Sequence, residues 1–371
     1  MKSHPASKNF FIERQLISKE KRKPAPGFDD EITFGRAHSN HMLTCDFLHD
    51  KGGWQTPRII PFGAFSMQPD SVAFHYGQQI FEGLKAFRME NTNELALFRP
   101  QLNAQRFYDS ALRLGMQPVP QELFIEGIKV LVSVDEDYLL AKPWSLYIRP
   151  CLIPLDCGVS YRASRDYRFF VILSAVKEYF SHHQCMSVYV EQEMARAFKG
   201  GIGNIKAGAN YAGALLALKK AQQCGADSVL WLDANEHRYV EEIGAMNIVF
   251  VYQDRLVTPP LLGTILPGVT RDAVLKLAQH FDMKIVEEQT DIGELIDHIR
   301  QGVLKEAFGC GTAAAITPIN QLILNEEKIN INDGVAGPVT VKLKKVLKEI
   351  QYGEVPDIFG WRTVVPIMDN N

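Results

Sequence analysis

The sequence has little that would suggest a metalloprotein, a disulfide-stabilised domain or a membrane protein. Its six cysteines include no C-x-x-C pair, which argues against a zinc site or a disulfide framework and is typical of reduced cytosolic thiols. His182, His183 and Cys185 are close in sequence, but no second Cys/His cluster completes a four-ligand metal set. Because no apolar run approaches the length of a membrane span, we expect no membrane association.

The chain also lacks an excess of positive charge. It has 40 Lys and Arg against 43 Asp and Glu, so it lacks the basic surface expected of a protein that binds nucleic acid or anionic lipid. The lysine-rich residues 1–26 contain no continuous apolar segment, so we expect no secretory signal and a cytoplasmic location. With 371 residues, 46% of them hydrophobic, the chain can form two domains of ordinary size.

Nucleotide-binding motifs are missing as well. No Walker sequence is present, and the relaxed dinucleotide fingerprint Gly309-x-Gly311-x-x-Ala314 is followed by residues 315–318, Ala-Ile-Thr-Pro, which do not predict a helix. Because the fingerprint needs a strand, a turn and a helix in succession, a nicotinamide-dependent dehydrogenase is not favoured.

Hydrophobic periodicity predicts a mixture of helices and strands. The expected strands are 41–46, 95–98, 144–152, 167–175, 187–191, 228–232, 248–252 and 304–308. The expected helices are 103–114, 121–134, 211–224, 270–281, 291–300 and 338–352, although Gly127 weakens the second. Helices do not alternate regularly with strands, so the predicted class is α+β or irregular α/β. We expect a flexible N-terminal arm (1–27), an N-terminal α/β domain (28–176), a linker (177–186) and a C-terminal domain (187–371).

One stretch, residues 199–211, combines four glycines with two lysines. Glycine allows close approach of the backbone to a ligand, and Lys206 lies inside the run, as a lysine bonded covalently to a flat cofactor would require. On this stretch alone, a glycine-rich turn with an exposed lysine is an equally good interpretation.

Further features suggest anion and acid sites. Helix N-termini bind phosphate, and Gly268-Val269-Thr270 precedes a predicted helix, while residues 309–312 form a second glycine-rich turn. Glu241 and Glu242 precede an apolar strand, where a solvated turn pair is the simpler interpretation. Lysine, acid and phosphate cradles together match the needs of pyridoxal phosphate, which requires a Schiff-base lysine, a carboxylate for its ring nitrogen and donors for its phosphate.

From about Phe34 to the end, the chain resembles the branched-chain amino acid aminotransferases of pyridoxal-phosphate fold type IV. The matching motifs occur in the order that the family has, at residues 76–87, 97–100, 145–150, 199–211, 242–247, 265–271, 308–312 and 349–353. This resemblance implies a smaller N-terminal α/β domain and a larger C-terminal pseudo-barrel domain.

The resemblance also implies residue roles. Lys206 matches the catalytic Schiff-base lysine and Glu242 the acid on the pyridine nitrogen. The remaining cofactor positions are matched by Arg106, Tyr211, Val269, Thr270 and Thr312. Positions around the substrate are matched by Phe34, Tyr76, Phe81, Tyr147, Arg149, Tyr179, Ala245 and Ala313. No metal is implied.

Two departures from the animal members of this family stand out. Ala245 occupies the position of a threonine that helps hold the substrate carboxylate, and the redox Cys-x-x-Cys is replaced by Ala314 and Thr317. We therefore expect backbone amides to bind the carboxylate and no thiol regulation of that kind.

The implied activity is reversible amino transfer between leucine, isoleucine or valine and 2-oxoglutarate, with glutamate and the branched 2-oxo acids as the other partners. A homodimer is implied, in which residues 152–158 complete the neighbouring subunit's pocket. A D-amino-acid aminotransferase or an aminodeoxychorismate lyase uses the same lysine and acid, but the segment Tyr76–Gly83 argues against both.

Overall fold

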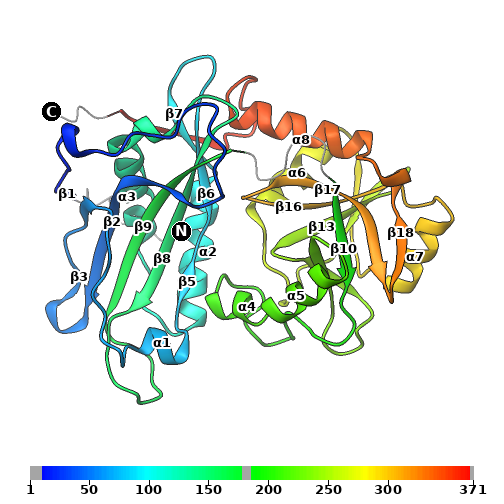
Figure 1. Ribbon diagram of the computed structural model, residues 1–371, viewed down its shortest axis with the longest axis horizontal. Helices are drawn as coiled ribbons and strands as arrows, with labels where there is room; N and C mark the ends of the chain where they lie inside the picture. The colour runs from blue at the N-terminus through cyan, green and yellow to red at the C-terminus, as the bar shows by residue number, and fades with distance from the viewer. Residues whose placement is uncertain (1–10, 178–184, 368–371) are drawn as a thin grey trace, which may run out of the picture. The chain divides into compact units, whose positions relative to one another are not determined.

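The computed structural model describes residues 11–177 and 185–367. Backbone contacts divide the chain into two compact units, Met1–Lys177 with Gln351–Asn371, and Glu178–Ile350 (Figure 1). The linker expected at 177–186 lies mostly outside the described residues. Each unit is described by itself.

The first unit is built on a ten-stranded sheet with the order β1-β4-β2-β9-β8-β6-β7-β19, in which β3 pairs with β2 and β5 with β8. The longest pairing is antiparallel and joins β8 to β9 from Ser145 opposite Val176 to Pro154 opposite Tyr167. The strands are β1 (Glu13–Arg14), β2 (Ala37–Leu48), β3 (Gly53–Trp54), β4 (Arg58–Pro61), β5 (Ile80–Phe81), β6 (Leu84–Arg88), β7 (Leu95–Phe98), β8 (Ser145–Pro154), β9 (Tyr167–Val176) and β19 (Arg362–Val365).

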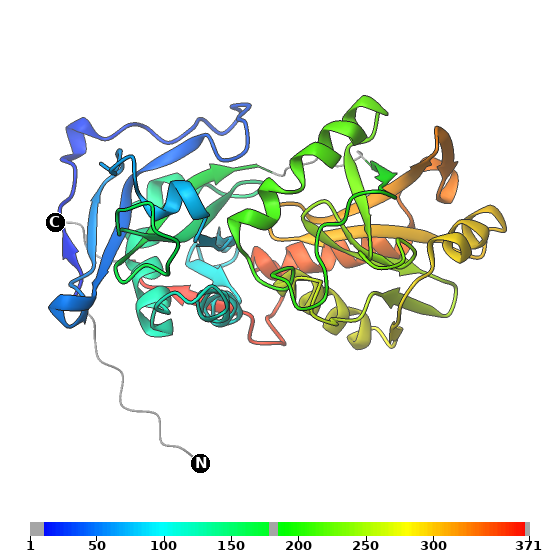
Figure 2. The same cartoon turned by 90° about the horizontal axis from the view of Figure 1, so that it is seen from below.

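Two helices, α2 (Pro100–Arg113) and α3 (Gln121–Val134), lie against one face of this sheet (Figure 2), and the short α1 (Val72–Tyr76) precedes β5. Phe107, Phe124 and Phe169 form the aromatic centre of the core, with ring centroids 5.4–6.0 Å apart. Gly127 is required inside α3 because a Cβ there would lie 2.6 Å from Leu43 Cδ2. The glycine therefore marks close packing of the helix on the sheet and does not break the helix.

Both ends of the described chain add strands to this sheet. β1 pairs in parallel with β4, and β19 pairs antiparallel with β7. The described part of the expected N-terminal arm is thus docked on the sheet, and Ile12 and Leu16 pack against the core. The domain boundaries 28–176 and 187–371 stay a prediction, although the pairing of β19 places the last described strand in the first unit.

The second unit contains a nine-stranded sheet with the order β12-β11-β10-β17-β16-β13-β14-β15, and β18 pairs with β17. β12 also pairs with β13, so six strands close into a ring that forms a barrel. The strands are β10 (Met186–Val190), β11 (Ser228–Leu232), β12 (Val240–Ile243), β13 (Met246–Val251), β14 (Arg255–Thr258), β15 (Lys284–Glu287), β16 (Glu306–Gly311), β17 (Ala315–Leu324) and β18 (Glu327–Asn330).

The helices of this unit are amphipathic and cover apolar strands. Buried Glu306 determines where the last one begins, because its carboxylate accepts hydrogen bonds from Val339 N and Thr340 N at 2.9 and 2.8 Å. The helices are α4 (Gly208–Ala212), α5 (Leu215–Gln223), α6 (Val269–His280), α7 (Ile292–Arg300) and α8 (Pro338–Gln351). No helix of the described ranges is long and apolar enough to cross a membrane.

The expected α+β class and two-part organisation are confirmed, and residues after Gly311 continue as β17, as the rejected dinucleotide fingerprint required. The single helix expected at 211–224 is wrong, because the chain forms α4 and α5 there. Its expected apolar face is also shifted. Ala217 and Ala221 are buried on α5, whereas Leu215 is 63% exposed.

Candidate active site

The glycine-lysine stretch is held in a fixed shape by one side chain and one close contact. Asn210 Nδ2 donates to the carbonyl oxygens of Ile202 and Ile205, at 2.8 and 3.0 Å. A Cβ on Gly203 would lie 2.3 Å from both Ala197 Cβ and Thr264 O, so only glycine fits there. The stretch is therefore a packed loop and not an open surface turn.

The two lysines of this loop differ in their surroundings. Lys199 is exposed, whereas Lys206 is half-buried and its Nζ donates to Tyr211 Oη at 2.8 Å. A phenol oxygen next to a half-buried amine suits a lysine that reacts with a carbonyl group, because the amine is oriented and kept from solvent. Lys206 is the better candidate of the two.

Glu242 lies on β12 and is only 3% exposed. Its Oε1 accepts from Leu266 N at 2.8 Å and from Asn247 Nδ2 at 3.3 Å, and its Oε2 lies 3.0 Å from Arg196 Nε. Burial raises the pKa of Glu242 to about 7, against the lowering effects of Arg196, the Leu266 N–H and Lys206. Such a carboxyl can share a proton with a ring nitrogen at neutral pH.

Glu241 and Glu242 are adjacent on β12, and successive strand side chains point to opposite faces. Glu241 accepts a hydrogen bond from Thr264 Oγ1, whereas Glu242 is bound by Arg196 and Leu266. With both residues at least nine-tenths buried, the interpretation as a solvated turn pair is wrong. The extended strand, not a turn, places them in two different environments.

The first turn of α6 contains Val269 and Thr270, which are both buried. A Cβ on the preceding Gly268 would lie 2.0 Å from Asn247 Oδ1, so the glycine allows this helix N-terminus to approach β13. Asn247 itself pairs with Glu242 on one side and with Cys310 on the other. The sheet therefore brings the acid and this helix N-terminus together, and backbone N–H groups there suit a phosphate.

Two turns lie side by side at one end of the barrel strands. Gly244 and Ala245 join β12 to β13, and Thr312 and Ala313 join β16 to β17. A Cβ on Gly311 would touch Met246 Cγ at 3.2 Å and lie 4.0 Å from Ala245 O. The structure thus groups Ala245, Thr312 and Ala313, and the side chain of Ala245 offers no hydroxyl.

In the first unit, four expected substrate residues form one cluster. Tyr147 and Arg149 share a face of β8, and Arg149 Nη2 donates to Tyr147 Oη at 3.0 Å. The guanidinium carbon of Arg149 lies 4.6 Å from the centroid of Phe81, and Phe34 meets Tyr147 edge-on at 4.9 Å. The cluster is an aromatic wall with one cation in it.

Arg106 lies on α2 and binds Glu82 through two hydrogen bonds, Nε to Oε1 at 2.6 Å and Nη2 to Oε2 at 2.9 Å. Glu82 is fully buried and also accepts from Asn103 Nδ2 and Gly83 N. The guanidinium is therefore held in one orientation by a buried clamp.

Tyr76 donates its hydroxyl proton to Val159 O, and its ring meets that of Tyr161 at 5.5 Å, next to the loop after β8. Tyr179 lies outside the described residues. No group of three or more potential metal ligands occurs within the ranges that the structure describes.

Sequence reasoning missed the residues that hold the proposed groups in place. Arg196, Thr264 and Asn247 surround the two acids, and Glu82 orients Arg106. Of these, only Asn247 and Glu82 fall inside a family motif. Arg196 and Thr264 give no signal in sequence, because only the folded chain brings them to Glu242 and Glu241.

The comparisons with known proteins agree with the geometry. Residues 79–322 match the family model described as amino-transferase class IV. The chain is 42% identical to branched-chain-amino-acid aminotransferase 2 of Bacillus subtilis, over 95% of this chain and 97% of that one.

Solved structures give the same result. The branched-chain aminotransferase of Escherichia coli matches with a TM-score of 0.70 and 28% identity, over 83% of this chain and 96% of that one. The branched-chain aminotransferase of T.th., complexed with N-(5'-phosphopyridoxyl)-L-glutamate, matches with a TM-score of 0.72 and 27% identity, over 88% and 99%. The resemblance found in the motifs is confirmed: the chain belongs to the class IV aminotransferase family, among the branched-chain-amino-acid aminotransferases.

Proposed function

We propose that this protein transfers an amino group between leucine, isoleucine or valine and 2-oxoglutarate, with pyridoxal phosphate as its cofactor. One observation carries the proposal. The barrel unit holds a buried carboxyl, Glu242, whose pKa is raised to about 7, together with a half-buried lysine, Lys206, on a packed glycine-rich loop. A lysine and an acid of this kind are what pyridoxal phosphate needs from a protein.

The residues present fit this cofactor. Lys206 offers an amine for the aldehyde, Glu242 a partner for the ring nitrogen and Tyr211 a hydroxyl beside the amine. The first turn of α6 with Val269 and Thr270 offers N–H groups for a phosphate, and we assign Thr312 and Arg106 to the same phosphate. Gly203 and Gly268 stand where any larger residue would clash.

When bound, the cofactor withdraws electrons from the amino acid's α-carbon. Lys206 Nζ accepts the α-proton as general base and returns it as general acid. Glu242 keeps a proton at the ring nitrogen, with Arg196 and the Leu266 N–H fixing its carboxylate. Tyr211 Oη, 2.8 Å from Lys206 Nζ, orients the amine.

We assign the substrate side chain to apolar and aromatic residues and its carboxylates to polar groups. Phe34, Tyr76, Phe81, Tyr147 and Tyr179 provide the aromatic surface, where burial of a branched side chain gains about 1.5–3 kcal/mol. Arg149 receives the side-chain carboxylate of glutamate, because a guanidinium stays charged. The backbone amides of Ala245 and Ala313 bind the α-carboxylate.

We further propose a cytoplasmic homodimer. The loop that follows β8 exposes apolar side chains, with Val159 68% and Tyr161 90% exposed. Exposed aromatic and aliphatic residues next to each other are typical of a protein interface. The expected contact segment, residues 152–158, leads directly into them.

Purified holoenzyme assayed with a panel of amino donors tests the proposal. L-Leucine, L-isoleucine and L-valine should each transfer their amino group to 2-oxoglutarate, and the protein should absorb in the near-ultraviolet to visible range. D-Alanine as the preferred donor, or aminodeoxychorismate as the only substrate, would instead identify another enzyme of the fold. Light scattering during the same assay checks for the dimer.

A further inference from the structure

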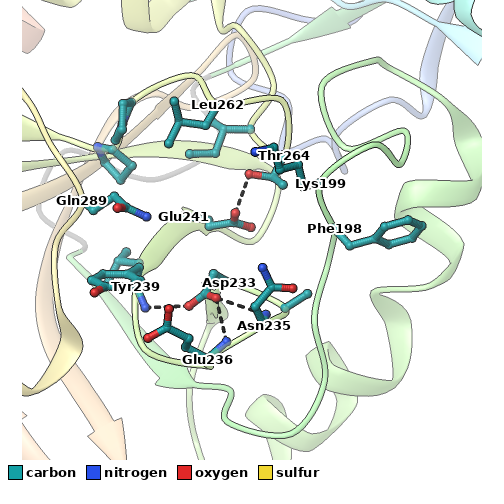
Figure 3. Close-up of a pocket in the computed structure, with 15 residues that line it drawn as sticks. Phe198, Lys199, Asp233, Asn235, Glu236, Tyr239, Glu241, Leu262, Thr264 and Gln289 are labelled. Carbon is teal, nitrogen blue, oxygen red and sulfur yellow. Dashed lines mark hydrogen bonds between the residues drawn. The ribbon is translucent and has the colours of Figure 1, made fainter.

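The barrel unit contains a cavity of about 370 Å³ that the proposed reaction does not use (Figure 3). Its wall is formed by Phe198 and Lys199, by the loop after β11, by β12 and by residues 259–265. None of the described lining residues belongs to the proposed cofactor or substrate set. The volume lies in the range of ordinary small-molecule pockets.

Glu241 points into this cavity from β12 (Figure 3). The residue is only 7% exposed. Its Oε1 accepts from Thr264 Oγ1, but Oε2 is buried and has no hydrogen-bond partner among the described residues. A buried carboxylate oxygen without a donor costs free energy, so its retention indicates that something else supplies the donor.

The charges around Glu241 favour a cation. The described wall has three acidic residues, Asp233, Glu236 and Glu241, against a single base, Lys199. Asp233 is already bonded to backbone N–H groups of the following loop, at 2.8–3.1 Å from Asn235, Glu236, Arg238 and Tyr239. Burial raises the pKa of Glu241, despite the Thr264 hydrogen bond and the attraction of Arg196.

The rest of the wall is apolar. Pro259, Pro260, Leu262 and Ile265 face the same space as the acid. Prolines offer flat, rigid hydrocarbon without N–H donors, which suits an aliphatic part of a ligand. Acid and hydrocarbon together define a compact amphiphilic cation.

We propose that this cavity is a second small-molecule site that binds a compact aliphatic ammonium ion, whose N–H donates to Glu241 Oε2 while its hydrocarbon lies against Pro259 and Pro260.

The experiment titrates N,N-dimethylbutylamine into the holoenzyme by calorimetry at neutral pH. This tertiary amine carries one N–H when protonated and cannot form an imine with the cofactor, so its heat reports this site alone. N,N,N-trimethylbutylammonium is the matched probe that keeps the charge and lacks the donor. Glu241→Gln removes the acid, and Glu236→Gln is the control in the same wall because Glu236 is exposed.

We expect saturable binding of one amine per chain, weaker by about tenfold or more in Glu241→Gln and for the quaternary probe, and changed less than about threefold in Glu236→Gln. A crystal soaked with the amine should show it within hydrogen-bond distance of Oε2, which keeps the test valid should Glu241→Gln fold poorly. No saturable heat at tens of millimolar, equal affinity in Glu241→Gln, or density only elsewhere would each overturn the proposal.

Discussion

Each unit contains a buried pair of one glutamate and one arginine, and the two pairs differ in how the carboxylate is bound. Glu82 accepts four hydrogen bonds from strong donors, two of them from Arg106. Glu242 meets Arg196 through one nitrogen, and burial raises its pKa to about 7. The first carboxylate is a clamp for its arginine, whereas the second is balanced between its charged and neutral forms. The comparison separates a residue that positions from one that takes part in proton chemistry.

The largest effect is expected from Lys206→Ala. Its loss removes both the covalent attachment and the proton carrier, so turnover should fall by at least about 10⁴-fold, and the visible absorbance of the cofactor should change. Lys199→Ala is the matched control, because Lys199 belongs to the same loop and is exposed. A normal rate in Lys206→Ala with a damaged Lys199→Ala would move the chemistry to the wrong lysine for this account.

Glu242→Gln tests the reactive member of the comparison. A neutral amide cannot keep the ring nitrogen protonated, so turnover should fall by about 10²- to 10³-fold while the protein stays folded and binds cofactor. Steady-state assays and cofactor absorbance measure the two effects separately. If Glu241→Gln lost turnover instead, the acid would have to be reassigned.

Glu82→Gln tests the clamp. Breaking a buried, fully bonded pair costs about 3–5 kcal/mol, so the free energy of unfolding should fall by that order. Denaturant unfolding of the variant and of Glu126→Gln gives the measurement, because Glu126 forms an exposed i,i+3 pair with Lys129 and should cost less than about 1 kcal/mol. Equal stability of the two variants would remove the distinction between clamp and reactive acid.

Arg149→Met should affect one half-reaction more than the other. The leucine half-reaction needs only apolar contacts from this region, whereas 2-oxoglutarate loses a charge-assisted partner, so its rate should fall by about 10- to 100-fold. Single-turnover absorbance changes with each substrate measure this directly. Equal losses on both sides would make Arg149 a structural residue beside Phe81 and Tyr147.

The pH dependence of stability provides the smallest test. The pKa of Glu242 is raised from 4.5 to about 7 in the folded protein, so the folded state binds more protons than the unfolded state between these values. Its contribution is complete below pH 4.5 and is lost as the pH rises through 7, by about 3 kcal/mol in all. The difference in unfolding free energy between the apo forms of wild type and Glu242→Gln should show this slope, and a flat difference would contradict the raised pKa.

Much of this organisation could be predicted from sequence, for identifiable reasons. Periodicity located α3 and β11 to the residue, because apolar spacing and punctuating residues are local signals. The motif around Lys206 was visible because the glycines are needed for close packing. Glu242 was distinguished from Glu241 by family resemblance alone.

The rest depends on contacts between distant residues. The break between α4 and α5, the pairing of β12 with β13 that closes the barrel, and the pairing of β19 with β7 have no local signature. Arg196 reaches Glu242 across 46 positions of sequence, the difference of their numbers, and Thr264 reaches Glu241 across 23. Only the folded structure shows that these side chains control the two acids.

The most direct test of the account asks which lysine holds the cofactor. Borohydride reduction of the holoenzyme fixes the cofactor permanently to its lysine, and mass spectrometry of the digested protein then locates the added mass. The account predicts the phosphopyridoxyl group on the peptide containing Lys206, and none on Lys199. The group on Lys199, on any other lysine or on no lysine would contradict it.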